Sequence, residues 1–163
     1  MAKTSYALAL GSNRRSRHGS PAATLRAALA ELAPQSASAI RLTPALGPAG
    51  RGFANAAAIV TSGLDPPALL CRVKEIERAF GRRGGRKWGA RVLDIDLILW
   101  SGGAWAEAGL VVPHPEMRLR AFVLEPLAEI APDWRDPLSG ATVRQLLVRL
   151  ARSAPVDRGG ARS

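Results

Sequence analysis

Two aspartates interrupt the most strand-like apolar stretch of this sequence. Residues 92–100 read Val-Leu-Asp-Ile-Asp-Leu-Ile-Leu-Trp, a length and composition typical of a buried strand. Because side chains alternate along a strand, Asp94 and Asp96 are expected on one face and the odd-numbered apolar residues, 93 to 99, on the other. The fold must therefore leave one face of this strand charged while it buries the opposite face.

Two carboxylates at this spacing have two interpretations. Anions this close repel each other and are costly to desolvate, so they usually need cations, and hard oxygen ligands at this spacing suit Mg²⁺. Alternatively, the polar face of the strand is solvated and each aspartate pairs with a nearby arginine. The spacing alone favours neither interpretation.

A basic, glycine-rich stretch precedes the two aspartates. Residues 82–91 read Arg-Arg-Gly-Gly-Arg-Lys-Trp-Gly-Ala-Arg, and the glycines favour neither helix nor strand. Such a segment suits a flap that closes over phosphates, with Arg82 and Arg91 neutralising their charge. The ordinary alternative is a solvated basic loop. Carboxylates for a metal beside arginines for phosphates are typical of a nucleotide phosphoryl-transfer site.

The remaining periodicities predict an α+β fold. Strands are predicted at 6–11, 40–43, 53–61 and 109–112, the last returning after a hairpin turn at 101–103. Helices are predicted from Ser20-Pro21 to Pro34, from Asp65-Pro66-Pro67 to Gly81, and over 122–131 and 143–150. This order of elements predicts a mainly antiparallel sheet with helices over one face.

The length and the single cysteine limit the organisation of the chain. Its 163 residues suit one domain, expected over 1–150, followed by a polar, flexible tail at 151–163. Cys71 alone can form neither an internal disulfide nor a cysteine zinc site, which fits a reducing cytoplasm. There is neither a signal-type segment nor a membrane-length apolar run, so no membrane association is expected.

The formal charge of +10 raises the possibility of a polyanion partner. Twenty of the 23 basic residues are arginine in a chain rich in alanine and glycine, so codon composition alone can produce the excess. An RNA- or DNA-binding module would place aromatic and basic residues on its strands. The acidic pair within a strand argues against this, and no nucleic-acid partner is expected.

A longer segment containing the aspartates resembles a known family. Residues 87–98, KWGARVLDIDLI, resemble the signature segment of the 6-hydroxymethyl-7,8-dihydropterin pyrophosphokinases. The similarity covers roughly residues 5–135, because further segments follow in the family's order: Gly11-Ser12-Asn13, Thr43 to Gly47, Phe53 to Ala57, Ile76-Glu77 with Gly81-Arg82, Val112-Pro113-His114, and Arg120 to Leu124. The resemblance implies a ferredoxin-like α+β sandwich.

The resemblance also implies a reaction and a site. The family transfers the β,γ-diphosphate of ATP to the 6-hydroxymethyl group of the dihydropterin, releasing AMP, in folate biosynthesis. Asp94 and Asp96 would hold two Mg²⁺ ions, with Arg82 and Arg91 assisting catalysis. The implied ATP contacts are Glu77, Trp88, Arg91, Ile98, His114 and Arg120. The implied pterin contacts are Thr43, Pro44, Leu46, Phe53, Asn55 and Phe122.

Several of these residues also have simpler interpretations. Phe53 and Phe122 match the aromatic pair that stacks on the pterin, but isolated phenylalanines are more often core residues. Taken alone, His114 beside Pro113 is more typical of a turn histidine with no ligand. Gly109 and Val111 replace polar or basic residues that contact the nucleotide in some members, and Pro115 replaces an aromatic residue. These departures leave room for a second hypothesis, an enzyme with the same fold and ATP site that acts on a different pterin or in a modified pathway. A monomer is expected.

Overall fold

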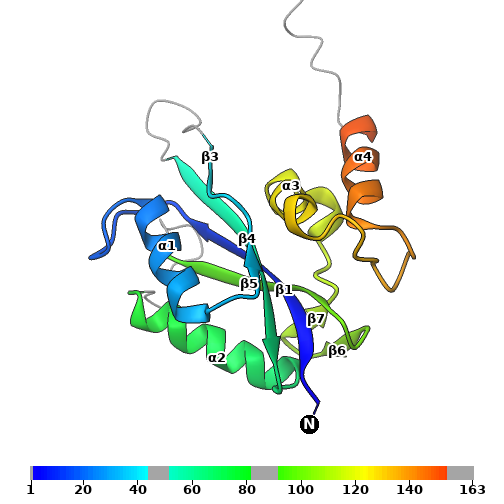
Figure 1. The fold of residues 1–163 in the computed structure, drawn as a ribbon, viewed down its shortest axis with the longest axis horizontal. Coiled ribbons are helices and arrows are strands. Elements are labelled where there is room, and N and C mark those ends of the chain that lie inside the picture. Colours follow the sequence, from blue (N-terminus) through cyan, green and yellow to red (C-terminus); the bar gives the residue numbers. More distant parts are fainter. Residues whose placement is uncertain (1, 44–51, 82–91, 154–163) are drawn as a thin grey trace, which may run out of the picture.

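The computed structural model describes residues 2–43, 52–81 and 92–153 (Figure 1). Its elements are, in order, β1 (Thr4–Ser12), α1 (Pro21–Leu32), β2 (Ser36–Ala37), β3 (Arg41–Thr43), β4 (Phe53–Ser62), α2 (Pro66–Ala79), β5 (Asp94–Trp100), β6 (Trp105–Glu107), β7 (Leu110–Val112), the 3₁₀ turn η1 (Met117–Leu119), α3 (Ala121–Ile130) and α4 (Val143–Ser153). The predicted α+β class is confirmed. Helix α4 extends three residues past the predicted domain end, and the rest of the predicted tail, 154–163, lies outside the described residues.

The main sheet is antiparallel. Its strand order is β2-β4-β1-β5, and β3 also pairs with β4. Strand β1 lies between β4 and β5 and runs antiparallel to both. The prediction of a mainly antiparallel sheet is therefore correct, and β5, which carries the two aspartates, lies beside the central strand.

Side-chain caps fix where the first two long helices begin. The Ser20 hydroxyl accepts a hydrogen bond from the Ala23 N–H at 3.2 Å, and the Asp65 carboxylate accepts one from the Ala68 N–H at 3.0 Å. Each cap satisfies a backbone donor that the first helical turn cannot, and a proline follows it. Gly81 follows α2 with φ of +107°, the left-handed conformation that ends a helix. In the described part of the chain, no helix is long and apolar enough to cross a membrane.

Helices cover both faces of the sheet, so the prediction of one covered face is wrong. Helices α1 and α2 pack on the first face, over a core that includes Leu8, Leu25 and Val73. Helices α3 and α4 lie on the other side, at the right of Figure 1, over a second core that includes Ile59 and Leu124. Small residues of β1 and β4 pack in this second core together with residues of α3.

Strand β5 does not alternate along its whole length. The register against β1 shifts by one residue between Leu97 and Leu99, which makes Ile98 the extra residue of a bulge. Leu93, Ile95 and Leu97 enter the first core as predicted. Leu99, expected on the same face, instead packs in the second core beside Ile98. The bulge reverses the side-chain pattern at Leu99.

The predicted returning strand does not extend the main sheet. The turn at 101–103 forms, since the Gly103 N–H donates to the Trp100 carbonyl at 3.1 Å. Strand β7, however, pairs with β6 in a separate two-stranded sheet. The free edge of β5 is occupied instead by Glu77, which accepts from the Ile95 N–H, and by the His114 N–H, which donates to the Ile98 carbonyl.

Candidate functional site

A row of four residues crosses the second face at one end of the sheet. Arg41 of β3 pairs with Asn55 of β4, Asn55 with Gly11 of β1, and Gly11 with Asp94 of β5. Directly opposed residues of antiparallel strands share a face. The predicted amide contact at Asn55 and the predicted metal ligand at Asp94 are therefore on the same face, with one glycine between them.

The residues between Asn55 and the aspartates are small. A second row places Ala57, Ala9 and Asp96 opposite one another. With Gly11 they form what we call the small-residue floor, defined by Ala9, Gly11 and Ala57. A methyl group on Gly11 would lie 3.3 Å from the Asn55 Oδ1, so the amide lies directly against this glycine. A flat ligand can rest on such a floor between an amide and two half-buried carboxylates.

Two exposed phenylalanines belong to the elements around this floor. Phe53 pairs with Thr43 and is on the same sheet face as Asn55, two residues further along the strand. Phe122 lies in the first turn of α3, and the guanidinium of Arg120 is 5.6 Å from its ring centroid. The exposed fractions of Phe53 and Phe122 are 46% and 49%. Neither is a core residue, so the simpler interpretation of both is wrong.

A cavity of about 320 Å³ opens along the edge of β5. It is lined by Leu70 and Lys74 of α2, Ile95, Asp96 and Leu97 of β5, and Gly109, Leu110, Val111, His114 and Pro115. Lys74, Asp96 and His114 are its ionisable residues. Because Asp96 also lies in the row beside the small-residue floor, this carboxylate is common to both regions.

His114 is both a turn residue and part of the cavity lining. Its ring Nδ1 accepts a hydrogen bond from the Glu116 N–H at 3.1 Å, and its backbone N–H donates to the Ile98 carbonyl at 2.9 Å. Ile98, implied as an ATP contact, has a side chain buried in the second core. Its neighbour Leu97 lines the cavity instead, because successive side chains of a strand point to opposite faces.

Glu77 has a different setting from that expected of an exposed nucleotide ligand. Its exposed fraction is 1%, and its Oε1 accepts a hydrogen bond from the Ile95 N–H at 3.1 Å. Its Oε2 lies 3.5 Å from the Lys74 ammonium. Ile95 lies between the two aspartates in sequence, so Glu77 holds α2 against the edge of β5 at the predicted metal site.

An ion-pair network that the sequence did not predict connects α3 to the row of site residues. The guanidinium of Arg41 lies 3.7 Å from the Glu125 carboxylate and 3.6 Å from the Glu129 carboxylate. Glu129 also accepts a hydrogen bond from the Ala39 N–H at 2.6 Å. Glu125 and Glu129 share a face of α3 with Phe122, and this i, i+3, i+7 spacing was the available sequence signal.

Some predicted residues lie outside the described part of the chain. These are Pro44, Leu46, Arg82, Trp88 and Arg91, together with the predicted flap at 82–91. Within the described ranges, no group of three or more His, Cys, Asp and Glu side chains is placed to hold a metal ion.

Comparison with known proteins by sequence identifies a family for this chain. A model of the 7,8-dihydro-6-hydroxymethylpterin-pyrophosphokinase (HPPK) family matches residues 7–132. A 2-amino-4-hydroxy-6-hydroxymethyldihydropteridine pyrophosphokinase of Haemophilus influenzae is 36% identical over 137 residues, covering 80% of this chain and 82% of that protein. A protein of the same name from Synechocystis is 48% identical over 103 residues, covering 63% of this chain and 53% of its own length.

Two solved structures share the fold. A crystal structure of HPPK-DHPS in complex with substrates has a TM-score of 0.73 and 12% identity, covering 94% of this chain and 45% of that one. The Plasmodium falciparum HPPK-DHPS structure has a TM-score of 0.69 and 13% identity, covering 94% of this chain and 46% of that one.

The fold and the site define a class of α+β proteins in which an antiparallel sheet places an acidic pair between a floor of small residues and a cavity. Within that class, this chain belongs to the 7,8-dihydro-6-hydroxymethylpterin-pyrophosphokinase family. It spans 53% of the Synechocystis relative and 61% of a Methylorubrum extorquens relative that is 47% identical over 98 residues.

Proposed function

We propose that this chain transfers diphosphate from ATP to the 6-hydroxymethyl group of 6-hydroxymethyl-7,8-dihydropterin and releases AMP, as a step of folate synthesis. One observation carries the proposal: Asp96 both lines the cavity and lies beside the small-residue floor. Two ligands bound in these regions would meet at the carboxylates. Such an arrangement fits a transfer between two substrates better than hydrolysis of one.

The pterin is proposed to lie on the small-residue floor. Asn55 offers an amide donor and an acceptor to the polar edge of the ring, and backbone groups near Thr43 lie along the same strand pair. The half-exposed rings of Phe53 and Phe122 offer faces on which a planar heterocycle can stack. Pro44 and Leu46 remain proposed contacts from the resemblance.

The nucleotide is proposed to occupy the cavity along β5. Lys74 and His114 supply polar groups there, and Leu70, Leu97 and Leu110 supply an apolar lining. Arg120 lies at the start of α3, six residues after His114, and offers a guanidinium to phosphates. Arg82, Arg91 and Trp88 are proposed to contribute from outside the described residues, as the resemblance implies.

Two Mg²⁺ ions are the proposed cofactor, and the donor set fits them. Asp94 and Asp96 are half-buried carboxylates on one face of a strand whose other residues are apolar. Mg²⁺ prefers oxygen ligands and usually keeps only one or two carboxylates, with phosphates and water completing the shell. When bound, the ions would neutralise charge on the phosphate oxygens. The protein's own part is to align the hydroxymethyl oxygen with the β-phosphorus and to exclude water.

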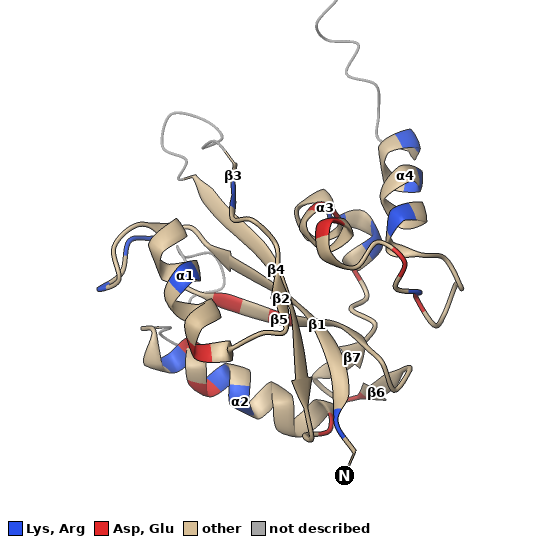
Figure 2. Cartoon of the chain, in the orientation of Figure 1, with Lys and Arg blue, Asp and Glu red and all other residues tan. Residues whose placement is uncertain are grey.

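We infer a ferredoxin-like sandwich from the strand order β2-β4-β1-β5 and from α1 and α2 on one face. Helices α3 and α4 would then be an addition on the second face. We also propose a cytoplasmic monomer that binds neither nucleic acid nor membrane. Among the described residues, Lys and Arg lie mainly on α1, α2, α4 and the loop before α1, and the sheet carries few of them (Figure 2).

The test is the dependence of AMP formation on the pterin. Purified protein is incubated with Mg²⁺ and ATP, with and without 6-hydroxymethyl-7,8-dihydropterin, and nucleotides are separated by chromatography. AMP formed in equal amounts with the pterin diphosphate supports the proposal. Release of ADP, or AMP formation independent of the pterin, contradicts it, and turnover only with another pterin alcohol supports the alternative substrate.

A further inference from the structure

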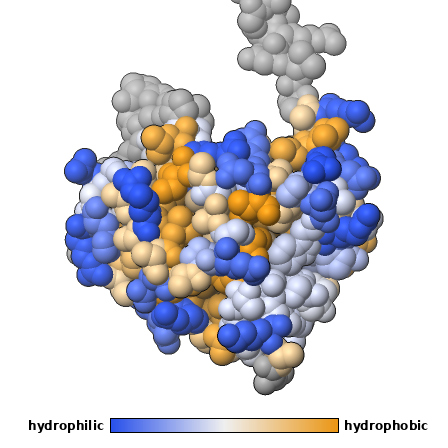
Figure 3. Space-filling view, viewed as in Figure 1, coloured by the Kyte–Doolittle hydropathy of each residue, from blue (hydrophilic) through white to orange (hydrophobic). Residues whose placement is uncertain are grey.

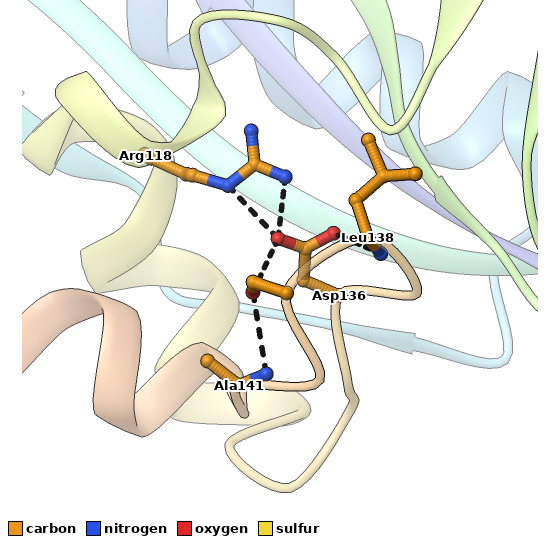
Figure 4. Close-up of polar contacts among 5 residues, drawn as sticks. Arg118, Asp136, Leu138 and Ala141 are labelled. Atoms are coloured by element: carbon orange, nitrogen blue, oxygen red, sulfur yellow. Dashed lines mark hydrogen bonds and ion pairs between the residues drawn. The ribbon is translucent and has the colours of Figure 1, made fainter.

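Asp136 is the centre of a buried polar cluster away from the proposed substrates. It lies in the loop between α3 and α4, and its exposed fraction is 0%. Its Oδ2 accepts hydrogen bonds from Nε and Nη2 of Arg118 at 2.8 and 2.5 Å and from the Ser139 hydroxyl at 2.7 Å (Figure 4). Its Oδ1 accepts from the Leu138 N–H at 3.0 Å.

The charge of this carboxylate is stabilised despite burial. Desolvation by burial acts to raise the pKa of Asp136, but hydrogen bonds from Ser139, Leu138 and Arg118 outweigh it and hold the pKa below its usual value. Two of these contacts, from Leu138 and Ser139, come from within the loop. The contact with Arg118 is different, since it joins the loop to a separate segment.

Arg118 belongs to the short segment that connects the cavity to α3. In this segment the Met117 N–H donates to the His114 carbonyl at 3.1 Å, and the Arg120 N–H donates to the Met117 carbonyl at 3.4 Å. Met117 is fully buried in the second core. The segment is therefore fixed at two adjacent residues, by apolar packing at Met117 and by the ion pair at Arg118.

The two ends of this segment carry site residues. His114 lines the cavity, and Arg120 forms the start of α3 with its guanidinium over the Phe122 ring. Replacing a buried ion pair by apolar residues often leaves stability unchanged, so such a pair is weak evidence for a purely stabilising role. Its directional hydrogen bonds, in contrast, restrict the segment to one position.

We propose that the Arg118–Asp136 pair is a positioning contact that sets the place of His114 and Arg120 relative to the nucleotide. This inference rests on the proposed function, because it assumes that the cavity binds ATP. Arg118 is not part of the cavity lining and acts through its neighbours. The pterin side is held separately, by Arg41 with Glu125 and Glu129 and by the packing of α3 on β4.

The test measures ligand binding, which does not require turnover. Binding of Mg²⁺ with a non-hydrolysable ATP analogue, and separately of 6-hydroxymethylpterin, is measured by calorimetry for wild type and Arg118→Ala. Guanidinium is then added at roughly 20 mM, far below denaturing concentrations, to refill the place of the missing side chain. Arg144→Ala is the matched control, because Arg144 makes an exposed ion pair of 3.4 Å with Asp133 in the same loop.

We expect Arg118→Ala to weaken binding of the ATP analogue by about fivefold or more, and binding of the pterin by less than about twofold. Guanidinium should restore nucleotide affinity in this variant and have no effect on Arg144→Ala. Unchanged nucleotide affinity would overturn the inference, as would a parallel loss for both ligands that guanidinium does not restore. A wild-type protein that binds no ATP analogue would instead count against the proposed function itself.

Discussion

Gly11 is the residue whose lack of a side chain most directly shapes the proposed pterin site. It lies between Asn55 and Asp94. A methyl group at position 11 would lie only 3.3 Å from the Asn55 Oδ1. We expect Gly11→Ala to displace the amide and weaken pterin binding by about tenfold, since a misplaced buried amide loses its hydrogen bonds. Binding of the ATP analogue should change little.

A double-mutant cycle checks this assignment. If Gly11→Ala acts through the amide, then Asn55→Ala should weaken pterin binding by a similar amount, and the double variant should be no worse than either single variant. Calorimetric titration of the four proteins measures this coupling. Independent, additive losses would mean that Gly11 acts on the pterin in another way.

Phe122 tests the stacking role of the second aromatic ring. Because the ring is half exposed, Phe122→Ala should change the melting temperature little, while pterin affinity falls by of order 1 kcal/mol or more. Leu119→Ala is the control, since Leu119 lies nearby in sequence and is 74% exposed. Equal losses for pterin and nucleotide, with a lower melting temperature, would indicate a structural role instead.

At the scale of elements, Glu77 holds α2 against β5. Removing its carboxylate with Glu77→Ala leaves the buried Ile95 N–H without its acceptor, which costs about 1–3 kcal/mol of unfolding free energy. Glu77→Gln keeps an acceptor oxygen and should cost less. Urea unfolding of the two variants measures the difference. A rise in the ATP KM of Glu77→Ala without a loss of stability would instead support the nucleotide contact implied by the resemblance.

The α3–α4 loop should make stability depend on pH through Asp136. A carboxyl whose folded pKa is depressed adds stability above its unfolded pKa, and this stability is lost as pH falls through the folded pKa. Asp136→Asn should therefore lower the unfolding free energy at pH 7 by about 2 kcal/mol, and the difference should shrink below about pH 4. Denaturant unfolding across this range, with exposed Asp133→Asn as control, measures it. A difference independent of pH would contradict the assignment.

Local signals in the sequence predicted most elements, and long-range contacts explain the failures. Ser20, Asp65 and Gly81 fix helix ends through contacts within a few residues, so their roles could be predicted. The bulge at Ile98 depends on pairing with β1, and the β6–β7 hairpin depends on what closes the β5 edge. Neither is encoded in local periodicity.

The candidate site shows the same division. The acidic pair could be predicted because two charges within an apolar strand are unusual on any fold. Arg118 and Asp136 are 18 residues apart with no motif joining them, and only the fold shows the contact. Leu97 was missed as a cavity residue because the cavity forms only where α2 and residues 109–115 meet the edge of β5, which is a long-range feature of the fold.

At the scale of the whole molecule, the proposed ligand regions meet at one end of the sheet. The face shown in Figure 3 exposes apolar surface along its middle, with hydrophilic residues on both sides. Exposed large apolar side chains among the described residues include Leu42, Phe53 and Phe122. Apolar surface beside charged residues suits a planar, polar-edged ligand. We therefore predict that a substitution at the carboxylates can stop diphosphate transfer while the substrates still bind.

Asp96→Asn separates them most directly, because Asp96 borders both the floor and the cavity. The substitution keeps the size of the side chain and removes its charge. Single-turnover formation of AMP from ATP and 6-hydroxymethyl-7,8-dihydropterin, at fixed Mg²⁺, is compared with pterin binding by the same protein. The account predicts that AMP formation falls by about 100-fold or more while pterin affinity stays within about twofold of wild type. AMP formation close to the wild-type rate would contradict the placement of the reaction at this carboxylate.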